Sequence, residues 1–350
     1  MKRLVLFSML LLSSITCTKS QTPFTRPESV VWDGARNRYL VSCVESQNIV
    51  ACNEEGIPIS VFKSGLTGPK GMIILDSILY LTDVNRILGF KLGTAEAFLT
   101  KPIPGAQFLN DITTDGAGNL YVTDSQTNKI HRIRIADNSL TDLITTTNSG
   151  PNGIYFDANN NRLIVVYMAE TPQKIQYVNL SDNSIGDVSS MPFTRADGLA
   201  FNNNTWYVSS WTSGRIYSLN QNMSQILDST AQTFNGPADF IYNPARNQFV
   251  LPVMMEHRLA LLDRISKVRD RKSKGFNVMP IPAVDDLFFE VGSEFEGGRY
   301  SILNLEGKET LSGSIIGGDQ KLSLKGLAPG SYFIKVSKGD LGASEKFMKN

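Results

Sequence analysis

A short pattern recurs six times along the chain, and this repeat constrains the fold more than any other feature. Each copy contains a turn, a residue that is usually polar, a small or acidic residue, and then three mostly apolar residues. The copies begin at Glu28, Lys70, Asn110, Asn152, Asp197 and Ala238, at intervals of 42, 40, 42, 45 and 41 residues. Proline precedes the polar residue in four copies, which marks a turn that leads into a strand.

Each repeat continues with further short strands. In the third copy, a turn at 116–119 is followed by the β-branched and aromatic run 120–124 and by the alternating segment 129–133. A looser fourth strand precedes each following turn. Four short strands per repeat are typical of a propeller blade, which buries both faces only by stacking against its neighbours. The chain is therefore predicted to be all-β, with a six-bladed β-propeller over residues 21–265 and a small C-terminal β-sandwich.

The N-terminus predicts export. A basic start is followed by a short apolar run and small residues, so residues 1–20 are interpreted as a signal peptide. Lipidation at Cys17 is an alternative, although Thr16 before it fits a lipobox poorly. No later stretch is long and apolar enough for a transmembrane segment. The net charge of +1 does not favour nucleic acid as a partner.

Two cysteines remain after the predicted processing, Cys43 and Cys52. They are expected to face each other across a hairpin that turns at Gln47 and Asn48, where they could form a disulfide or remain packed thiols.

The repeat pattern stops near Asp263, and a different β-rich unit follows. The polar and basic segment 266–275 is predicted to be a linker, and residues 276–350 a separate domain. The run Met279–Ala283, the segment Leu327–Tyr332 and the tail Glu345–Lys349 resemble the type IX secretion (type A) sorting domain of Bacteroidetes. The resemblance implies contact with the secretion machinery, and a protein that is secreted or held on the outer cell surface.

One residue from each repeat should lie near the propeller axis, because the innermost strands all start at the same face. That ring contains Glu28, Lys70, Asn110, Asn152, Asp197 and Ala238, and the next positions include Asp111 and Asp239. Carboxylates gathered around an axis need protons or a cation to compensate them. Oxygen ligands favour calcium or magnesium, whereas zinc sites usually include His or Cys. His131 and His257 are expected on third strands, away from the ring, which also disfavours a Ser-His-Asp nucleophile.

Several of these motifs are similar to those of the senescence marker protein, gluconolactonase and luciferin-regenerating enzyme family. They are the segments that begin at Glu28, Leu109, Pro151 and Asp197, together with Trp211–Arg215. The resemblance implies one divalent metal ion, calcium first with zinc or magnesium as alternatives, bound by Glu28, Asn152 and Asp197. Asp197 would also be the catalytic base, and Asn110 would face a small-molecule substrate. Lys70 and Asp239 are further candidates for substrate binding. The implied activity is hydrolysis of a sugar lactone or related ester.

Other interpretations stay open. Glu28 and Lys70 could form only an ion pair, Asn152 and Asp197 could be turn residues before glycine, and Trp211 could serve packing. The segment Asn119–Asp124 resembles an NHL repeat, so a non-catalytic propeller that binds a glycan, peptide or protein is the main alternative function. A strictosidine-synthase-like enzyme is a third, but no specific motif supports it.

Overall fold

The computed structural model describes residues 24–169, 171, 174–190, 194–263, 265, 277–279, 282–339 and 341–350. The predicted signal peptide, Cys17 and the predicted linker lie outside these residues. Within the described part, no helix has the length and apolar character needed to cross a bilayer. The chain divides into two compact units, the propeller and a C-terminal β-domain.

The propeller contains five sheets of four strands and one of three. Each of the first five sheets follows chain order from the innermost to the outermost strand, as predicted. Blade 1 contains β1 (Pro27–Asp33), β2 (Arg38–Cys43), β3 (Asn48–Cys52) and β4 (Pro58–Lys63). Blade 2 contains β5 (Pro69–Leu75), β6 (Ile78–Asp83), β7 (Arg86–Lys91) and β8 (Ala97–Pro102). Blade 3 contains β9 (Leu109–Thr114), β10 (Asn119–Asp124), β11 (Lys129–Arg134) and β12 (Ser139–Thr145).

The second half of the ring repeats this arrangement. Blade 4 contains β13 (Pro151–Asp157), β14 (Arg162–Tyr167), β15 (Lys174–Asn179) and β16 (Ile185–Ser190). Blade 5 contains β17 (Ala196–Asn202), β18 (Thr205–Ser210), β19 (Arg215–Leu219) and β20 (Ile226–Ser229). Blade 6 contains β21 (Ile241–Asn243), β22 (Gln248–Val253) and β23 (Arg258–Leu262), and no fourth strand among the described residues. Short 3₁₀ helices, η1 (Gly34–Arg36) and η2 (Met254–Glu256), lie in blades 1 and 6.

Apolar clusters between adjacent blades hold the ring together. Val31 packs with Met72 and Leu81 of blade 2, whereas its neighbour Val30 packs with Val250 of blade 6. Successive side chains of a β-strand point to opposite faces of the sheet, so Val30 and Val31 pack against different neighbouring blades. The apolar side chains on each face of a blade are buried only by contact with the neighbouring blade. The blades therefore form a closed ring.

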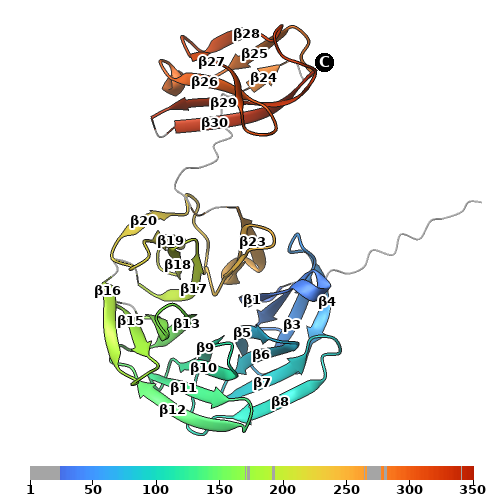
Figure 1. The fold of residues 1–350 in the computed structure, drawn as a ribbon. Helices are drawn as coiled ribbons and strands as arrows, with labels where there is room; N and C mark the ends of the chain where they lie inside the picture. The colour runs from blue at the N-terminus through green and yellow to red at the C-terminus, as the bar shows by residue number, and fades with distance from the viewer. Residues whose placement is uncertain are drawn as a thin grey trace, which may run out of the picture. The chain divides into compact units, whose positions relative to one another are not determined.

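The ring closes by contact of blade 1 with blade 6, which lie side by side in Figure 1. The backbone N–H of Asp239 donates to the carbonyl of Glu28 at 3.0 Å. The amide of Asn243 also donates to the Tyr39 hydroxyl at 2.9 Å. Hydrogen bonds between the first and last blades therefore reinforce the apolar contact.

The C-terminal unit is a sandwich of two antiparallel sheets around one apolar core. One sheet contains β24 (Asn277–Met279), β25 (Asp286–Glu290) and β28 (Asp319–Ser323). The other contains β27 (Glu309–Ser314), β26 (Arg299–Leu303), β29 (Gly330–Lys338) and β30 (Leu341–Lys349), and η3 (Ser293–Phe295) precedes it.

The sequence motifs of this unit meet in space. Ala283 donates its N–H to the carbonyl of Met348 at 2.7 Å, and Tyr332 stacks on Phe347 with ring centroids 5.8 Å apart. The Tyr332 hydroxyl donates to the carbonyl of Ala328 at 2.9 Å. The opening motif and the tyrosine motif therefore both contact the C-terminal strand.

The expectation that Cys43 and Cys52 face each other across the hairpin is wrong. The register of β2 and β3 places Cys43 opposite Asn48 and Cys52 opposite Tyr39, because the connecting turn has four residues instead of two. Both cysteines are buried and free.

Candidate functional site at the propeller axis

The predicted ring residues lie at irregularities of the innermost strands. The pairing of β1, β5, β13 and β17 with their neighbours skips Glu28, Lys70, Asn152 and Asp197, and that of β9 skips Asn110 and Asp111. Bulges of this kind turn side chains away from the normal alternation. The same irregularity in five blades explains how residues from different repeats reach one axis.

Hydroxyl groups on the second strands hold these bulges in place. The Thr123 hydroxyl accepts the N–H of Asp111 at 3.0 Å and donates to the carbonyl of Asn152 in the next blade at 2.8 Å. In the same way, the Ser209 hydroxyl accepts the N–H of Gly198 at 2.8 Å and donates to the carbonyl of Ala238 in the next blade at 3.0 Å. Each hydroxyl therefore fixes the bulge of its own blade and the position of the next.

Two glycines let the innermost strands approach closely. A Cβ at Gly153 would collide with the carbonyl oxygen of Asp197, and one at Gly198 would lie 2.8 Å from the Cα of Asp239. Any larger residue would push the neighbouring strand outward. The glycine after each of these ring residues therefore has a packing reason, which the sequence pattern alone could not give.

The three predicted metal ligands are all buried at this axis. Glu28, Asn152 and Asp197 are 4%, 0% and 3% exposed. The Oε2 atom of Glu28 and the Oδ1 atom of Asn152 have no hydrogen-bond partner. Buried acceptors without partners are costly, so their presence marks a place where a cation would be stabilising. Among the described residues, no three His, Cys, Asp or Glu side chains form a metal-binding group, so a cation held here would also need the amide oxygen of Asn152.

Burial controls the protonation of these carboxyls. It raises the pKa of Glu28 well above its usual range, although the charge of Lys70 partly offsets this. Burial also raises the pKa of Asp197 to about 7, against the lowering effects of the Trp211 hydrogen bond, Lys70 and Asn152. Repulsion from the nearby Asp197 carboxylate also raises the pKa of Glu28.

A second pair of carboxyls lies one residue further along the innermost strands. Asp111 accepts the N–H groups of Ile112 and Ile154 at 2.7 and 2.9 Å, and burial raises its pKa to about 8. Asp239 accepts the Ser29 hydroxyl at 2.7 Å, and burial raises its pKa well above the usual range. The bonds from Ile154 to Asp111 and from Ser29 to Asp239 join adjacent blades. A substrate-binding role for Asp239 stays a prediction.

The two remaining candidates lie on neighbouring blades. The Asn110 amide is buried and donates to the Ser125 hydroxyl at 3.1 Å. The Nζ atom of Lys70 lies 4.7 Å from the ring centre of Phe108, a side chain that is 38% exposed. Lys70 is therefore positioned between the buried carboxyls and an exposed aromatic ring. Its charge lowers the pKa of both Glu28 and Asp197.

Sequence reasoning assigned the two histidines to third strands, and this is correct only for His131. His257 lies in the turn before β23, where its Nδ1 atom accepts the N–H of Arg26 at 3.1 Å. It therefore lies beside the loop that leads to Glu28.

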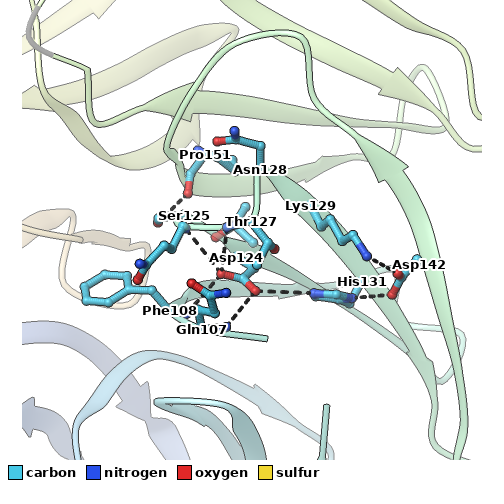
Figure 2. Close-up of polar contacts among 12 residues, drawn as sticks. Gln107, Phe108, Asp124, Ser125, Thr127, Asn128, Lys129, His131, Asp142 and Pro151 are labelled. Atoms are coloured by element: carbon cyan, nitrogen blue, oxygen red, sulfur yellow. Dashed lines mark hydrogen bonds and ion pairs between the residues drawn. The ribbon is translucent and has the colours of Figure 1, made fainter. Parts of the chain in front are cut away.

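His131 belongs to a buried polar network in blade 3 that the sequence did not indicate (Figure 2). Its Nδ1 lies 2.8 Å from Asp142, and its Nε2 lies 3.8 Å from Asp124. Asp124 also accepts the N–H groups of Gln107 and Phe108, both at 3.0 Å. The network therefore holds the loop that carries Phe108 to the top of the blade. Its members come from separate strands, so no local motif could have revealed it.

Comparisons with known proteins agree with this architecture. Residues 277–350 match the secretion system C-terminal sorting domain. No curated protein is significantly similar in sequence to the chain. A gluconolactonase from Xanthomonas campestris has a similar structure, with 15% identity and a TM-score of 0.60 over 69% of this chain and 87% of that one.

Two further structures show the same fold. An auxiliary nutrient binding protein from Bacteroides ovatus has 12% identity and a TM-score of 0.59 over 69% of each chain. A streptogramin B lyase has 16% identity and a TM-score of 0.52 over 69% of this chain and 94% of that one. The chain therefore combines a β-propeller of the kind seen in these proteins with a type IX sorting tail, which marks it for export and attachment at the cell surface.

Proposed function

We propose that the propeller is a metal-dependent hydrolase of lactones or related esters. The observation that carries this proposal is the group formed by Glu28, Asn152 and Asp197, which brings two buried carboxyls and a partnerless amide oxygen to one axis. These three residues would hold one divalent cation, with calcium as the best match to an all-oxygen site. The fold it shares with a gluconolactonase supports the choice of lactones.

The chain's own residues suit ester hydrolysis. A bound divalent ion would supply a Lewis acid for the carbonyl group and increase the acidity of water. Asp197 would be ionised when the cation is bound, and it would then accept a proton from the attacking water. Water adds to the carbonyl carbon, the ring C–O bond breaks, and the proton passes to the departing oxygen to give a hydroxy acid. Lys70 would favour the negative charge that develops on the substrate.

The direct test combines metal binding with activity. Calcium and zinc binding to the purified chain would be measured by calorimetry, together with hydrolysis of D-glucono-1,5-lactone. We expect Glu28→Gln to bind metal far more weakly and to recover part of its activity in excess metal. Asp197→Asn should not recover, because it also loses the base. Glu45→Gln, an exposed carboxylate on the same end of blade 1, is the matched control. Normal metal binding and hydrolysis in both site variants would refute the proposal.

A second candidate function is binding without catalysis. Two observations favour it: the shared fold includes nutrient binding proteins, and the amide NH2 groups of Asn110 and Asn152 already donate to the Ser125 hydroxyl and the Ala196 carbonyl. In that case the parent chain would bind a ligand at the axis without turnover, and Asp197→Asn would change affinity only.

A further inference from the structure

An apolar rim surrounds the polar axis on the face where the innermost strands begin. The first residue after the second strand is Val84 in blade 2, Met168 in blade 4 and Trp211 in blade 5. In blade 6, Met255 is the second residue after β22. Phe108 occupies the adjoining loop of blade 3. Val84, Phe108, Met168 and Met255 are 37%, 38%, 37% and 45% exposed, so apolar surface from several blades faces solvent here.

The backbone places these residues at equivalent points. The N–H groups of Met168 and Trp211 donate to the residue that precedes the innermost strand of their own blade, at 2.8 and 3.0 Å. Ser125 donates to Phe108 in the same way at 2.9 Å. In blade 6 the N–H of Met254, next to Met255, donates to Gly236 at 2.8 Å. The same backbone hydrogen bond therefore recurs at the rim in blades 3, 4 and 5, and Met255 of blade 6 donates to Asn235 at 3.2 Å.

Further contacts tie the rim to the polar axis. Phe108 lies under the Lys70 ammonium, and Trp211 donates to Asp197. A Cβ built on Gly236 would lie 3.3 Å from Trp211 and 3.1 Å from Met255, so these two side chains flank the same glycine. The apolar surface is therefore continuous with the candidate catalytic group.

The rim offers few hydrogen bonds to a ligand. Ser125, which takes the equivalent position in blade 3, already donates to the carbonyl of Pro151 at 2.6 Å and accepts from Asn110. A free sugar lactone carries hydroxyl groups on most of its carbons, and these would lose water against valine, methionine and phenylalanine without replacement. An aliphatic or aromatic substituent would instead gain from burial there.

We infer that the ligand of this site is a lactone or ester with an apolar substituent, whose carbonyl end lies at the axis and whose apolar part lies on the rim. This inference rests on the proposed function, because it names the substrate class of the same site. Exposed apolar surface gathered around a polar centre is a common property of small-molecule sites.

The test compares lactones that share a ring and differ in chain length. We expect kcat/KM to be about tenfold higher for γ-nonalactone than for γ-butyrolactone, from partial burial of the added methylene groups, and higher than for D-glucono-1,5-lactone. Met168→Ser and Met255→Ser should each reduce the ratio between the two γ-lactones. Ile59→Ser removes a more exposed apolar side chain from the outermost strand of blade 1 and should leave the ratio unchanged.

Binding of lactams, which the enzyme should not hydrolyse, separates the two proposals. N-octyl-2-pyrrolidinone should bind more tightly than 2-pyrrolidinone in calorimetry, and Met168→Ser should weaken only the former. If the lactams bind in this way but no lactone is hydrolysed, the hydrolase proposal is rejected and the rim remains an apolar ligand site. The opposite outcome would be hydrolysis of gluconolactone, equal kcat/KM for the two γ-lactones and equal affinity for the two lactams. It would overturn the rim proposal and leave the hydrolase proposal standing.

Discussion

The indole N–H of Trp211 donates a 2.7 Å hydrogen bond to the Oδ2 atom of Asp197, within blade 5. Trp211 follows β18 and Asp197 lies at the bulge of β17, so the bond spans the top of one hairpin. A charge-assisted bond of this kind stabilises the ionised carboxylate, and it opposes the effect of burial on the pKa of Asp197. The tryptophan is therefore a positioning residue for the candidate base, beyond the packing role considered from sequence.

Replacing Trp211 with Phe tests this relationship. Trp211→Phe keeps an aromatic ring but removes the donor, so the pKa of Asp197 should rise above about 7. Calcium affinity at neutral pH should fall by about tenfold, because a hydrogen bond to a charged group contributes about 1.5–3 kcal/mol. Calorimetry over a pH series should show the binding curve displaced to higher pH. Trp32→Phe, in blade 1, is the control, and an equal displacement there would contradict the assignment.

Metal binding should release protons. Burial raises the pKa of Asp197 to about 7 and that of Glu28 well above its usual range, so the metal-free site is partly protonated at neutral pH. A cation needs the ionised carboxylates, hence its affinity should increase as the pH rises through about 7. Calorimetry at pH 7 in two buffers of different ionisation enthalpy measures the number of protons released. A value near zero in both Glu28→Gln and the parent would contradict a carboxylate site.

The metal-free protein should lose stability as the pH rises. Asp111 has a pKa of about 8, and that of Asp239 is raised well above the usual range, so the folded chain holds protons that the unfolded chain releases. The free energy of unfolding should thus be highest near pH 4 and decline up to about pH 8. Asp239→Asn removes one of these carboxyls and leaves an amide that can still accept from Ser29. We expect it to raise Tm at pH 8 and to change Tm little at pH 4; an equal change at both would argue against buried protonated carboxyls.

The repeat spacing was enough to predict the blades and the axial ring, because both depend on local strand patterns and on six-fold repetition. Glu28, Asn152 and Asp197 do lie together, although their metal stays a prediction. The hairpin after β2 was predicted wrongly, because no Asn-Gly or similar pair defines the turn length between Cys43 and Asn48. The contacts of Trp211 and His131 depend on side chains from separate strands, which strand periodicity does not reveal.

The two cysteines should react only when the chain opens. Burial raises the pKa of Cys43 to about 11 and that of Cys52 further, so few thiolates exist in the folded protein. A thiol reagent at pH 8 should label both residues slowly under native conditions, and should find two free thiols in the unfolded, unreduced mature chain. Finding none would restore the disulfide that the register of β2 and β3 excludes.

The buried histidine of blade 3 should contribute more to stability than the exposed lysine beside it. His131 is 1% exposed and lies between Asp124 and Asp142, whereas Lys129 pairs with Asp142 at the surface at 2.6 Å. Replacing His131 with Phe leaves the buried Asp124 carboxylate facing an apolar ring in place of the polar imidazole, whose Nε2 atom lies 3.8 Å away. We expect His131→Phe to lower the free energy of unfolding by about 2 kcal/mol, and Lys129→Ala to lower it by less than about 1 kcal/mol.

Urea denaturation at pH 7 measures both values, and the pH dependence supplies an independent check. Burial alone would raise the pKa of Asp124, but the nearby His131 ring and hydrogen bonds from the N–H groups of Thr127, Gln107 and Phe108 hold it well below its usual range. The stability that this carboxylate contributes is present above its unfolded pKa of about 4 and is lost as the pH falls further. His131→Phe should therefore lose less stability between pH 5 and pH 3 than the parent does. An unchanged acid slope would show that the backbone N–H groups alone stabilise Asp124, and that the histidine serves only to fill space between β10 and β12.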